Sequence, residues 1–241
     1  MKRADHQPRY KQGPLPARTA IDRGFMLLTS LLLLLLVIST FNNNWERWGT
    51  AKRLMLDTVS KSPLKQRPRV NLGWAYQQEG DYYNALNQYQ NASILYPSSP
   101  ADGMINYVFI HQNTGQILIG LGRMEEAGTV LLKAWNKQPG HPGLAINLSK
   151  VLFETSVGTP QQEQNVNAAL DVMKYSISVR DAGLTEHWFN AVSLGMLHFN
   201  YGVILRFANQ CTAAQDSFNT ASETLVDYPV VNLDCADNIS Y

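Results

Sequence analysis

The sequence has few charged residues. Asp, Glu, Lys and Arg make up 16% of its 241 residues, against about a quarter in typical soluble domains. Basic residues are concentrated at the start, where residues 1–23 hold six basic and two acidic side chains. The rest of the chain holds fourteen basic and seventeen acidic side chains. A mildly acidic body lacks the basic surface that nucleic-acid binding requires, so we expect no nucleic-acid partner.

The sequence also lacks the motifs of common enzymes. It contains no G-x-x-x-x-G-K-[ST] phosphate loop, no G-x-G-x-x-G dinucleotide fingerprint and no G-x-S-x-G nucleophile elbow. Its five histidines show no spacing typical of metal ligands, and the haem-attachment motif C-x-x-C-H is missing. We therefore predict a protein that is not an enzyme and has no cofactor, no metal and no small-molecule substrate.

An uncharged apolar run spans residues 24–41. At 1.5 Å per residue, a helix over this run would reach about 27 Å, close to the roughly 30 Å of a bilayer core. The alternative is a cleaved signal peptide, which has a shorter apolar core and a small-x-small cleavage site. The following NNNWERW provides no such site. We predict a single retained transmembrane helix.

The charges beside this run predict its orientation. By the positive-inside rule the basic arm, residues 1–23, stays in the cytoplasm. The body then lies in the periplasm, anchored in the inner (cytoplasmic) membrane. The only two cysteines, Cys211 and Cys235, could pair as a disulfide in that compartment. Two unrelated buried thiols are the alternative.

Small residues recur at helical spacing within residues 71–97. Gly73 lies in a first amphipathic segment that ends at EGD, where Gly80 suits a left-handed turn and Asp81 suits the cap of a second helix. Ala85 lies on the apolar face of that second helix. The stretch resembles a tetratricopeptide repeat (TPR), a 34-residue helix–turn–helix unit. Its characteristic positions are filled here by Gly73, Tyr76, Ala85, Tyr89, Ala92 and Pro97.

The first repeat, at residues 66–99, has successors in the same register. They are predicted at 108–141, after an eight-residue insertion, at 142–181, with a turn lengthened by VGTPQQEQ, and at 185–229, which together with the first make a TPR array over 66–229. The first helix of the fourth repeat is expected to begin near Thr185.

Upstream, Ala51 and Pro63 keep the 34-residue phase. Residues 42–65 thus resemble the second half of a repeat, and an ordinary linker helix is the alternative. Residues 230–241 would form a C-terminal tail. The resemblance implies an all-α fold, a right-handed TPR-type helix-hairpin solenoid of about four helix pairs plus a half repeat on one N-terminal transmembrane helix.

TPR proteins usually hold peptide ligands along the concave face of their first helices. The resemblance places thirteen residues on such a partner-binding groove: Arg67, Trp74, Gln77, Gln78, Phe109, Gln112, Gln116, Ile119, Lys150, Phe153, Phe199, Arg206 and Phe207. Val70 and Trp74 replace two members of the Lys/Asn set with which some TPR proteins grip a carboxylate. The groove is therefore expected to be apolar and aromatic with amide edges. At the fourth repeat, inward packing of Phe199 and Phe207 is an equal alternative.

His111 and His198 share one repeat offset, at which side chains pack between repeats. Interface histidines are favoured over a metal pair because no acidic or sulfur ligand accompanies them.

These observations favour a membrane-anchored scaffold or accessory subunit that binds other membrane or periplasmic proteins in an envelope complex. The alternative is a transient assembly or regulatory factor that binds an exported client through its groove. A component of a glycan export or transfer system is disfavoured. About 30 residues around the anchor and NLGWAY resemble multi-pass membrane proteins of glycan handling, but the multi-span domain that carries the chemistry there is missing.

Overall fold

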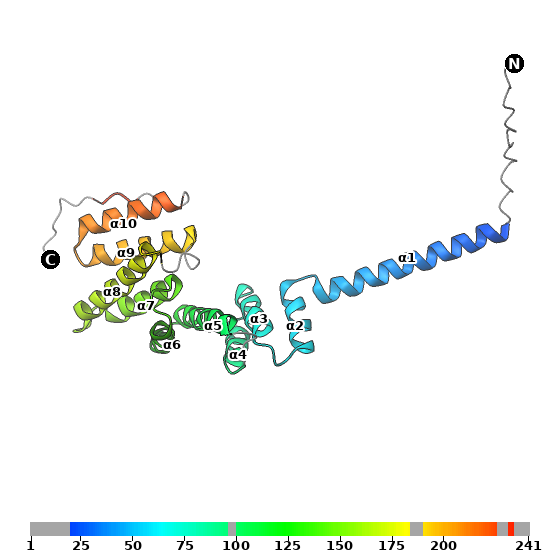
Figure 1. Ribbon diagram of the computed structural model, residues 1–241, viewed down its shortest axis with the longest axis horizontal. Coiled ribbons are helices and arrows are strands. Elements are labelled where there is room, and N and C mark those ends of the chain that lie inside the picture. The colour runs from blue at the N-terminus through cyan, green and yellow to red at the C-terminus, as the bar shows by residue number, and fades with distance from the viewer. Residues whose placement is uncertain (1–19, 96–99, 184–189, 226–230, 234–241) are drawn as a thin grey trace, which may run out of the picture. The chain divides into compact units, whose positions relative to one another are not determined.

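The computed structural model describes residues 20–95, 100–183, 190–225 and 231–233, and every regular element within them is a helix (Figure 1). The chain divides into two units, residues 1–53 and 54–241. The first unit holds α1 (Ala20–Trp48), and α2 (Ala51–Lys61) crosses the boundary between the units. The second unit holds the remaining eight described helices.

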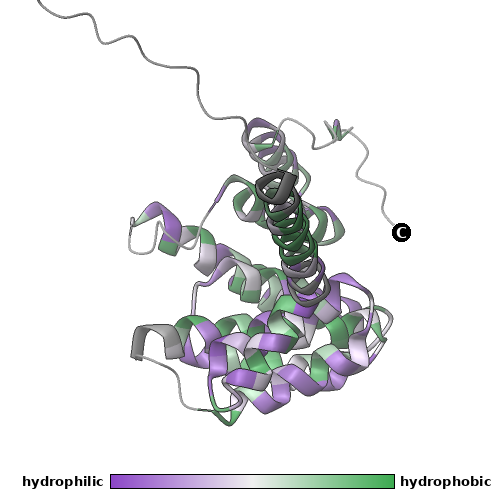
Figure 2. Cartoon of the chain, turned by 90° about the vertical axis from the view of Figure 1, so that its right-hand side faces the viewer, coloured by the Kyte–Doolittle hydropathy of each residue, from purple (hydrophilic) through white to green (hydrophobic). Residues whose placement is uncertain are grey.

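Helix α1 contains one stretch, Phe25–Asn42, that is apolar and long enough to cross a membrane by length and composition. None of this stretch is buried inside the protein, and Figure 2 shows hydrophobic residues, in green, along the helix. The predicted run at residues 24–41 therefore forms a continuous helix. Its leucines keep more than half of their surface exposed, which is costly in water, so this helix suits an apolar environment.

The second unit consists of four helix pairs: α3 (Gln66–Gln78) with α4 (Tyr82–Ser93), α5 (Pro100–Gly120) with α6 (Met124–Lys137), α7 (Pro142–Ser156) with α8 (Gln162–Asp181), and α9 (Ala191–Phe207) with α10 (Cys211–Thr224). The first helices of successive pairs, α3, α5, α7 and α9, also contact one another in series. The predicted all-α solenoid is therefore confirmed.

Glycines at the helix–helix contacts set the distance between the two helices of a pair. A Cβ atom added to Gly73 would lie 2.7 Å from the ring of Tyr89, and one added to Gly115 would lie 2.5 Å from the side chain of Leu131. Gly202 faces Phe218 in the same way, at 2.9 Å. In these three pairs the first helix thus offers a hollow that receives a large side chain sixteen residues later. This pairing explains why the pattern recurs at a fixed spacing.

The turn predicted between the first two segments forms as expected. Gly80 has φ +76°, a left-handed conformation that glycine adopts without steric cost. The Asn84 backbone N–H donates to Asp81 Oδ1 at 3.2 Å, so Asp81 caps α4.

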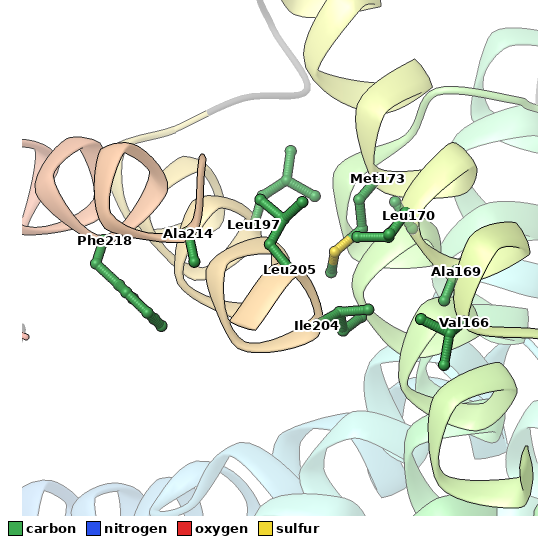
Figure 3. Close-up of a cluster of buried hydrophobic side chains, with 10 residues drawn as sticks. Val166, Ala169, Leu170, Met173, Leu197, Ile204, Leu205, Ala214 and Phe218 are labelled. Carbon is green, nitrogen blue, oxygen red and sulfur yellow. The ribbon is translucent and has the colours of Figure 1, made fainter. Parts of the chain in front are cut away.

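Three apolar clusters follow one another along the second unit. The first joins α3, α4 and α5, the second joins α5, α6 and α7, and the third joins α7 to α10. In the third cluster, Met173 and Leu170 of α8 face Leu197 and Leu205 of α9 (Figure 3). Each pair therefore completes its core with the next pair, as expected of stacked repeats.

The second pair differs from its predicted bounds. Helix α5 begins at Pro100, so the predicted insertion before residue 108 extends the helix instead of forming a loop. Proline is well tolerated at a helix start, and the added residues include Asn106, whose Nδ2 donates to Gln66 Oε1 at 2.9 Å. Gln66 Nε2 in turn donates to the carbonyls of Ala92 and Leu95 at the end of α4. This buried link fixes the extension of α5 against the first pair.

Helix α2 begins at Ala51, as the half-repeat hypothesis expects, but none of its residues is buried. The fourth pair begins with Asn190, which caps α9. The predicted start near Thr185 lies outside the described residues.

Candidate partner-binding surfaces

The exposed side of the first helices α3, α5, α7 and α9 is called the inner face here. On its first two helices the face carries two large apolar side chains, Trp74, which is 44% exposed, and Phe109, which is 36% exposed. Val70, which shares α3 with Trp74, is buried. Val70 lies one turn before Trp74 on the same face of α3, whereas the buried Leu72 lies on the opposite side. Trp74 is therefore the large apolar side chain of this face of α3 that stays exposed.

A polar hollow of about 210 Å³ lies between α3 and α5, lined by three predicted groove residues, Gln77, Gln78 and Gln116. Gln77 Nε2 donates to Gln116 Oε1 at 3.4 Å. Tyr89 hydroxyl donates to Gln77 Oε1 at 2.9 Å, and burial raises the pKa of Tyr89. The hollow therefore offers amide groups in fixed positions, which can pair with a peptide backbone.

A second hollow of about 290 Å³ is mainly apolar and is lined by Phe109 and Gln112 of α5 with Met104, Ile105 and His141 among its other residues. The Gln112 side chain packs directly against Gly143, so this wall is held by α7. Asn147 Nδ2 donates to the Gln112 carbonyl at 3.4 Å.

The remaining predicted groove residues lie in other environments. Ile119 is half-buried against the second core cluster, Arg67 is exposed and Arg206 is half-buried. Lys150 forms an exposed ion pair with Glu154, 3.6 Å between Nζ and Oε1.

The aromatic residues of the last two pairs contact one another. The ring centroids of Phe153 and Phe207 are 4.9 Å apart in an edge-to-face arrangement. Those of Phe199 and Phe218 are 5.4 Å apart, and Phe199 packs against the third cluster. Inward packing therefore describes Phe199, whereas Phe207 keeps 40% of its surface exposed. Of the predicted residues, Gln77, Gln78 and Gln116 share one hollow and Phe109 and Gln112 line another, whereas Phe153 of α7 meets Phe207 of α9.

Cys211 is the first residue of α10 and is in the disulfide-bonded form. Its predicted partner, Cys235, lies outside the described residues, so the pairing itself stays a prediction.

Sequence reasoning missed a hollow on the opposite side of the first two pairs. We call it the outer groove: it lies between α4 and α6 with α5 as its floor, and it consists of two volumes of about 670 and 570 Å³. The two volumes share Ser93, Ile110 and His111. Tyr83, Val130 and Lys137 lie on the outward faces of the second helices, so their positions indicate a surface that packing within the repeats does not use.

The two histidines at the shared repeat offset are both half-buried. His111 Nδ1 lies 2.7 Å from the Tyr107 carbonyl, whereas His198 Nε2 is buried without a hydrogen-bond partner in the described part of the chain. Burial lowers the pKa of both. Among the described residues, no three His, Cys, Asp or Glu side chains are grouped to hold a metal ion.

Comparison with known proteins agrees with this architecture. A family profile described as tetratricopeptide repeat matches residues 67–97. The crystal structure of MamA is similar, with a TM-score of 0.50 and 14% identity over 72% of this chain and 85% of that chain. The crystal structure of YrrB, titled a TPR protein with an unusual peptide-binding site, gives a TM-score of 0.39 and 13% identity over 74% of this chain and 95% of that chain.

No curated protein matches the sequence significantly. The likeness to MamA, at 14% identity, shows the fold alone. Residues 67–97 match the tetratricopeptide repeat, and the helix pairs of the second unit stack in a TPR-like solenoid.

Proposed function

We propose that this protein is a non-enzymatic, membrane-anchored scaffold, an accessory subunit that holds another protein of an envelope membrane complex on its inner face. The TPR fold supports binding of protein partners. The observation that carries the proposal is the exposure of Trp74 and Phe109 on adjacent first helices. Phe109 lines the apolar hollow, and Trp74 lies one helical turn before Gln77 and Gln78 of the polar hollow. Aromatic side chains contribute much of the binding energy of protein interfaces.

The chemistry of this surface favours an apolar helix or extended segment of the partner. Two exposed rings would bury apolar area, and the amides of Gln77, Gln78 and Gln116 would satisfy backbone or polar groups at its edge. No ionised side chain lines either hollow. A ligand held mainly by a charged carboxylate is therefore disfavoured here.

A substitution series tests the proposal. Trp74→Ala and Phe109→Ala in the full chain, expressed at native level, should each remove most of the partner that copurifies from detergent-solubilised membranes. Leu132→Ala is the matched control, because Leu132 is 49% exposed but lies on α6, away from both hollows. All three proteins should keep their helical circular dichroism. Equal partner recovery from all three, or the absence of any partner, contradicts the proposal.

Permanent and transient partners can be separated with the same variants. A transient assembly or regulatory factor is the second candidate, because the amide side chains of the polar hollow between α3 and α5 suit an interface more polar than that of most permanent subunits. In a permanent complex Trp74→Ala lowers the amount of assembled complex. In a transient one it leaves the final complex intact and slows its formation in a pulse-chase experiment.

The proposed location has its own test. Residues 24–41 would anchor the chain in the inner membrane, with residues 1–23 in the cytoplasm and the repeats in the periplasm, as the charge asymmetry favours. A reporter enzyme that is active only outside the cytoplasm should be active when fused to the C-terminus and inactive when fused to the N-terminus. The reverse result contradicts the orientation.

A further inference from the structure

The outer groove lies on the opposite side of α5 from the proposed inner-face site. Its walls run along α4 and α6, whose lengths of 12 and 14 residues correspond to about 20 Å of helix. That length accommodates about six residues of extended peptide. The groove is therefore long enough for a chain segment rather than a single small group.

The middle of the outer groove is apolar and its sides carry amides. Leu86, Leu118 and Val130 line it together with Asn87 and Gln90. Amide side chains can pair with a peptide backbone while apolar ones accept its side chains. This combination is suited to a polypeptide.

The two ends of the groove differ in charge. At one end Arg123 is already paired, because its Nε and Nη2 donate to the two oxygens of Glu126 at 2.7 Å each. At the other end Lys133 and Lys137 lie one helical turn apart, and no acidic residue is among the described residues that line this end. Lys137 Nζ lies 4.2 Å from the centre of the Tyr107 ring. Two lysine side chains therefore line this end of the groove, and the described residues beside them include no carboxylate.

The floor at this end is fixed. The rings of Tyr107 and His111 are stacked with centroids 4.0 Å apart, and the link from Gln66 to Asn106 holds the neighbouring turn of α5. Burial lowers the pKa of His111, and the nearby charges of Lys133 and Lys137 lower it further. The basic end is thus a preformed surface rather than two isolated lysines.

We propose that the outer groove binds an acidic peptide segment of a partner protein, with its apolar side chains in the middle of the groove and its carboxylates at Lys133 and Lys137. Charge complementarity supports this occupant: among the described residues that line the groove, Arg123 is paired with Glu126, whereas Lys133 and Lys137 have no acidic residue beside them at their end. The apolar walls and amides favour a peptide over an anionic membrane surface, which would need only the charges. This site is separate from the proposed function of the inner face and does not depend on it.

Fluorescence polarisation with the full chain in uncharged detergent tests the proposal. The probe is a labelled peptide of about twelve residues with leucines followed by glutamates, and its matched control carries glutamines in place of the glutamates. We expect the acidic probe to bind at least about tenfold more tightly than the control, with binding weakened by salt. Equal binding of the two peptides, or no binding of the acidic one, overturns the proposal.

Substitutions locate the site. Lys137→Glu should weaken binding of the acidic probe by about tenfold, and Lys133→Glu with Lys137→Glu should abolish it. Lys174→Glu on α8 is the matched control, since Lys174 is also exposed but lies outside the groove. Trp74→Ala should leave probe binding unchanged, which separates this site from the inner face. Equal loss in Lys137→Glu and Lys174→Glu overturns the assignment.

An anionic membrane is the other class of partner, and co-flotation with phosphatidylglycerol vesicles tests it. The chain is held in neutral nanodiscs for this experiment. The proposal predicts no difference between the unsubstituted chain and the double lysine variant. Vesicle binding that the double variant loses, without peptide binding, would assign the patch to lipid and overturn the proposal.

Discussion

Two rings on α3 and α5, Trp74 and Phe109, keep more than a third of their surface exposed, while Phe153 and Phe199 on α7 and α9 lie against other rings. The small-to-large pairing inside each hairpin is nevertheless shared, as Gly73 with Tyr89 and Gly202 with Phe218 show. The repeat register therefore determines how the helices of a pair approach each other. The neighbours of each pair determine which of its aromatic residues remain free.

The last described helix pair, α9 with α10, contacts a short segment near the C-terminus. Residues 231–233 pack against it, with Val231 and Leu233 on the third apolar cluster. Gln215 of α10 holds this segment, because its Nε2 donates to the Val231 carbonyl at 2.8 Å and its Oε1 accepts from the Leu233 N–H at 2.7 Å. Residues 231–233 thus cover apolar surface of the last described pair, where a stacked neighbour would otherwise lie.

The comparison predicts that the buried ring of the last pair matters most for stability. Phe218, which is 5% exposed, should cost about 3–5 kcal/mol when changed to Ala, because a large cavity forms opposite Gly202. Phe207→Ala, on the partly exposed ring, should cost clearly less. Urea unfolding of the full chain in detergent, followed by circular dichroism, measures both. Similar losses would show that the two rings are equally buried.

A smaller loss of stability is expected when the hollow at Gly115, between α5 and α6, is filled. Gly115→Val should destabilise the protein by about 1–3 kcal/mol, because its Cβ would meet Leu131. Gly120 lies on the same helix with nothing within 4 Å of an added Cβ, so Gly120→Val is the matched control. The two thermal unfolding midpoints should differ in that direction. An unchanged midpoint for Gly115→Val contradicts the account of helix spacing.

Removing the clamp on the C-terminal segment should have a smaller effect still. Gln215→Ala loses two hydrogen bonds to residues 231–233, each contributing about 0.5–1.5 kcal/mol. Amide hydrogen exchange at Leu233 should become at least about fivefold faster, while exchange in α3 stays the same. Unchanged exchange at Leu233 would mean that the side chain does not hold the segment.

The smallest expected effect on stability is its dependence on pH, which involves His111 in the second helix pair and His198 in the fourth. Burial lowers the folded-state pKa of His111, which faces Lys133 and Lys137, and of His198, which faces Arg180 and Asp181. Near pH 6.5, the ordinary pKa of histidine, the unfolded chain therefore binds more protons than the folded chain. Stability should be complete above pH 6.5 and decline as the pH falls below it.

Unfolding at pH 8 and pH 5.5 measures this dependence. The double substitution His111→Gln with His198→Gln should reduce it. An identical pH dependence in the double variant would show that other groups are responsible.

The fold could be predicted from the sequence because the residues that determine it lie close together in the chain and recur along it. Gly73, Ala85 and Ala92 are small where helices touch, and Gly80 with Asp81 forms the turn as expected. The length of α5 could not be predicted, since it depends on the contact of Asn106 with Gln66, forty residues away. The position of Phe199 could not be predicted either, because its ring packs against Phe218 of another helix.

The candidate sites divide in the same way. The residues of α3 and α5 follow the register and lie together, so resemblance was sufficient to find them. The outer groove depends on the distance between α4 and α6, which are not neighbours in sequence. Only the arrangement of three helices in space shows that Lys133, Lys137 and Tyr107 share one hollow.

The central claim is that the inner face of the first two pairs holds the protein partner. Its most direct test is photocrosslinking in intact membranes with a photoreactive amino acid at position 74 or, as the control, at position 132. The account predicts an adduct with a defined protein from position 74 and none from position 132. No adduct from position 74, or the same adduct from both positions, would contradict it.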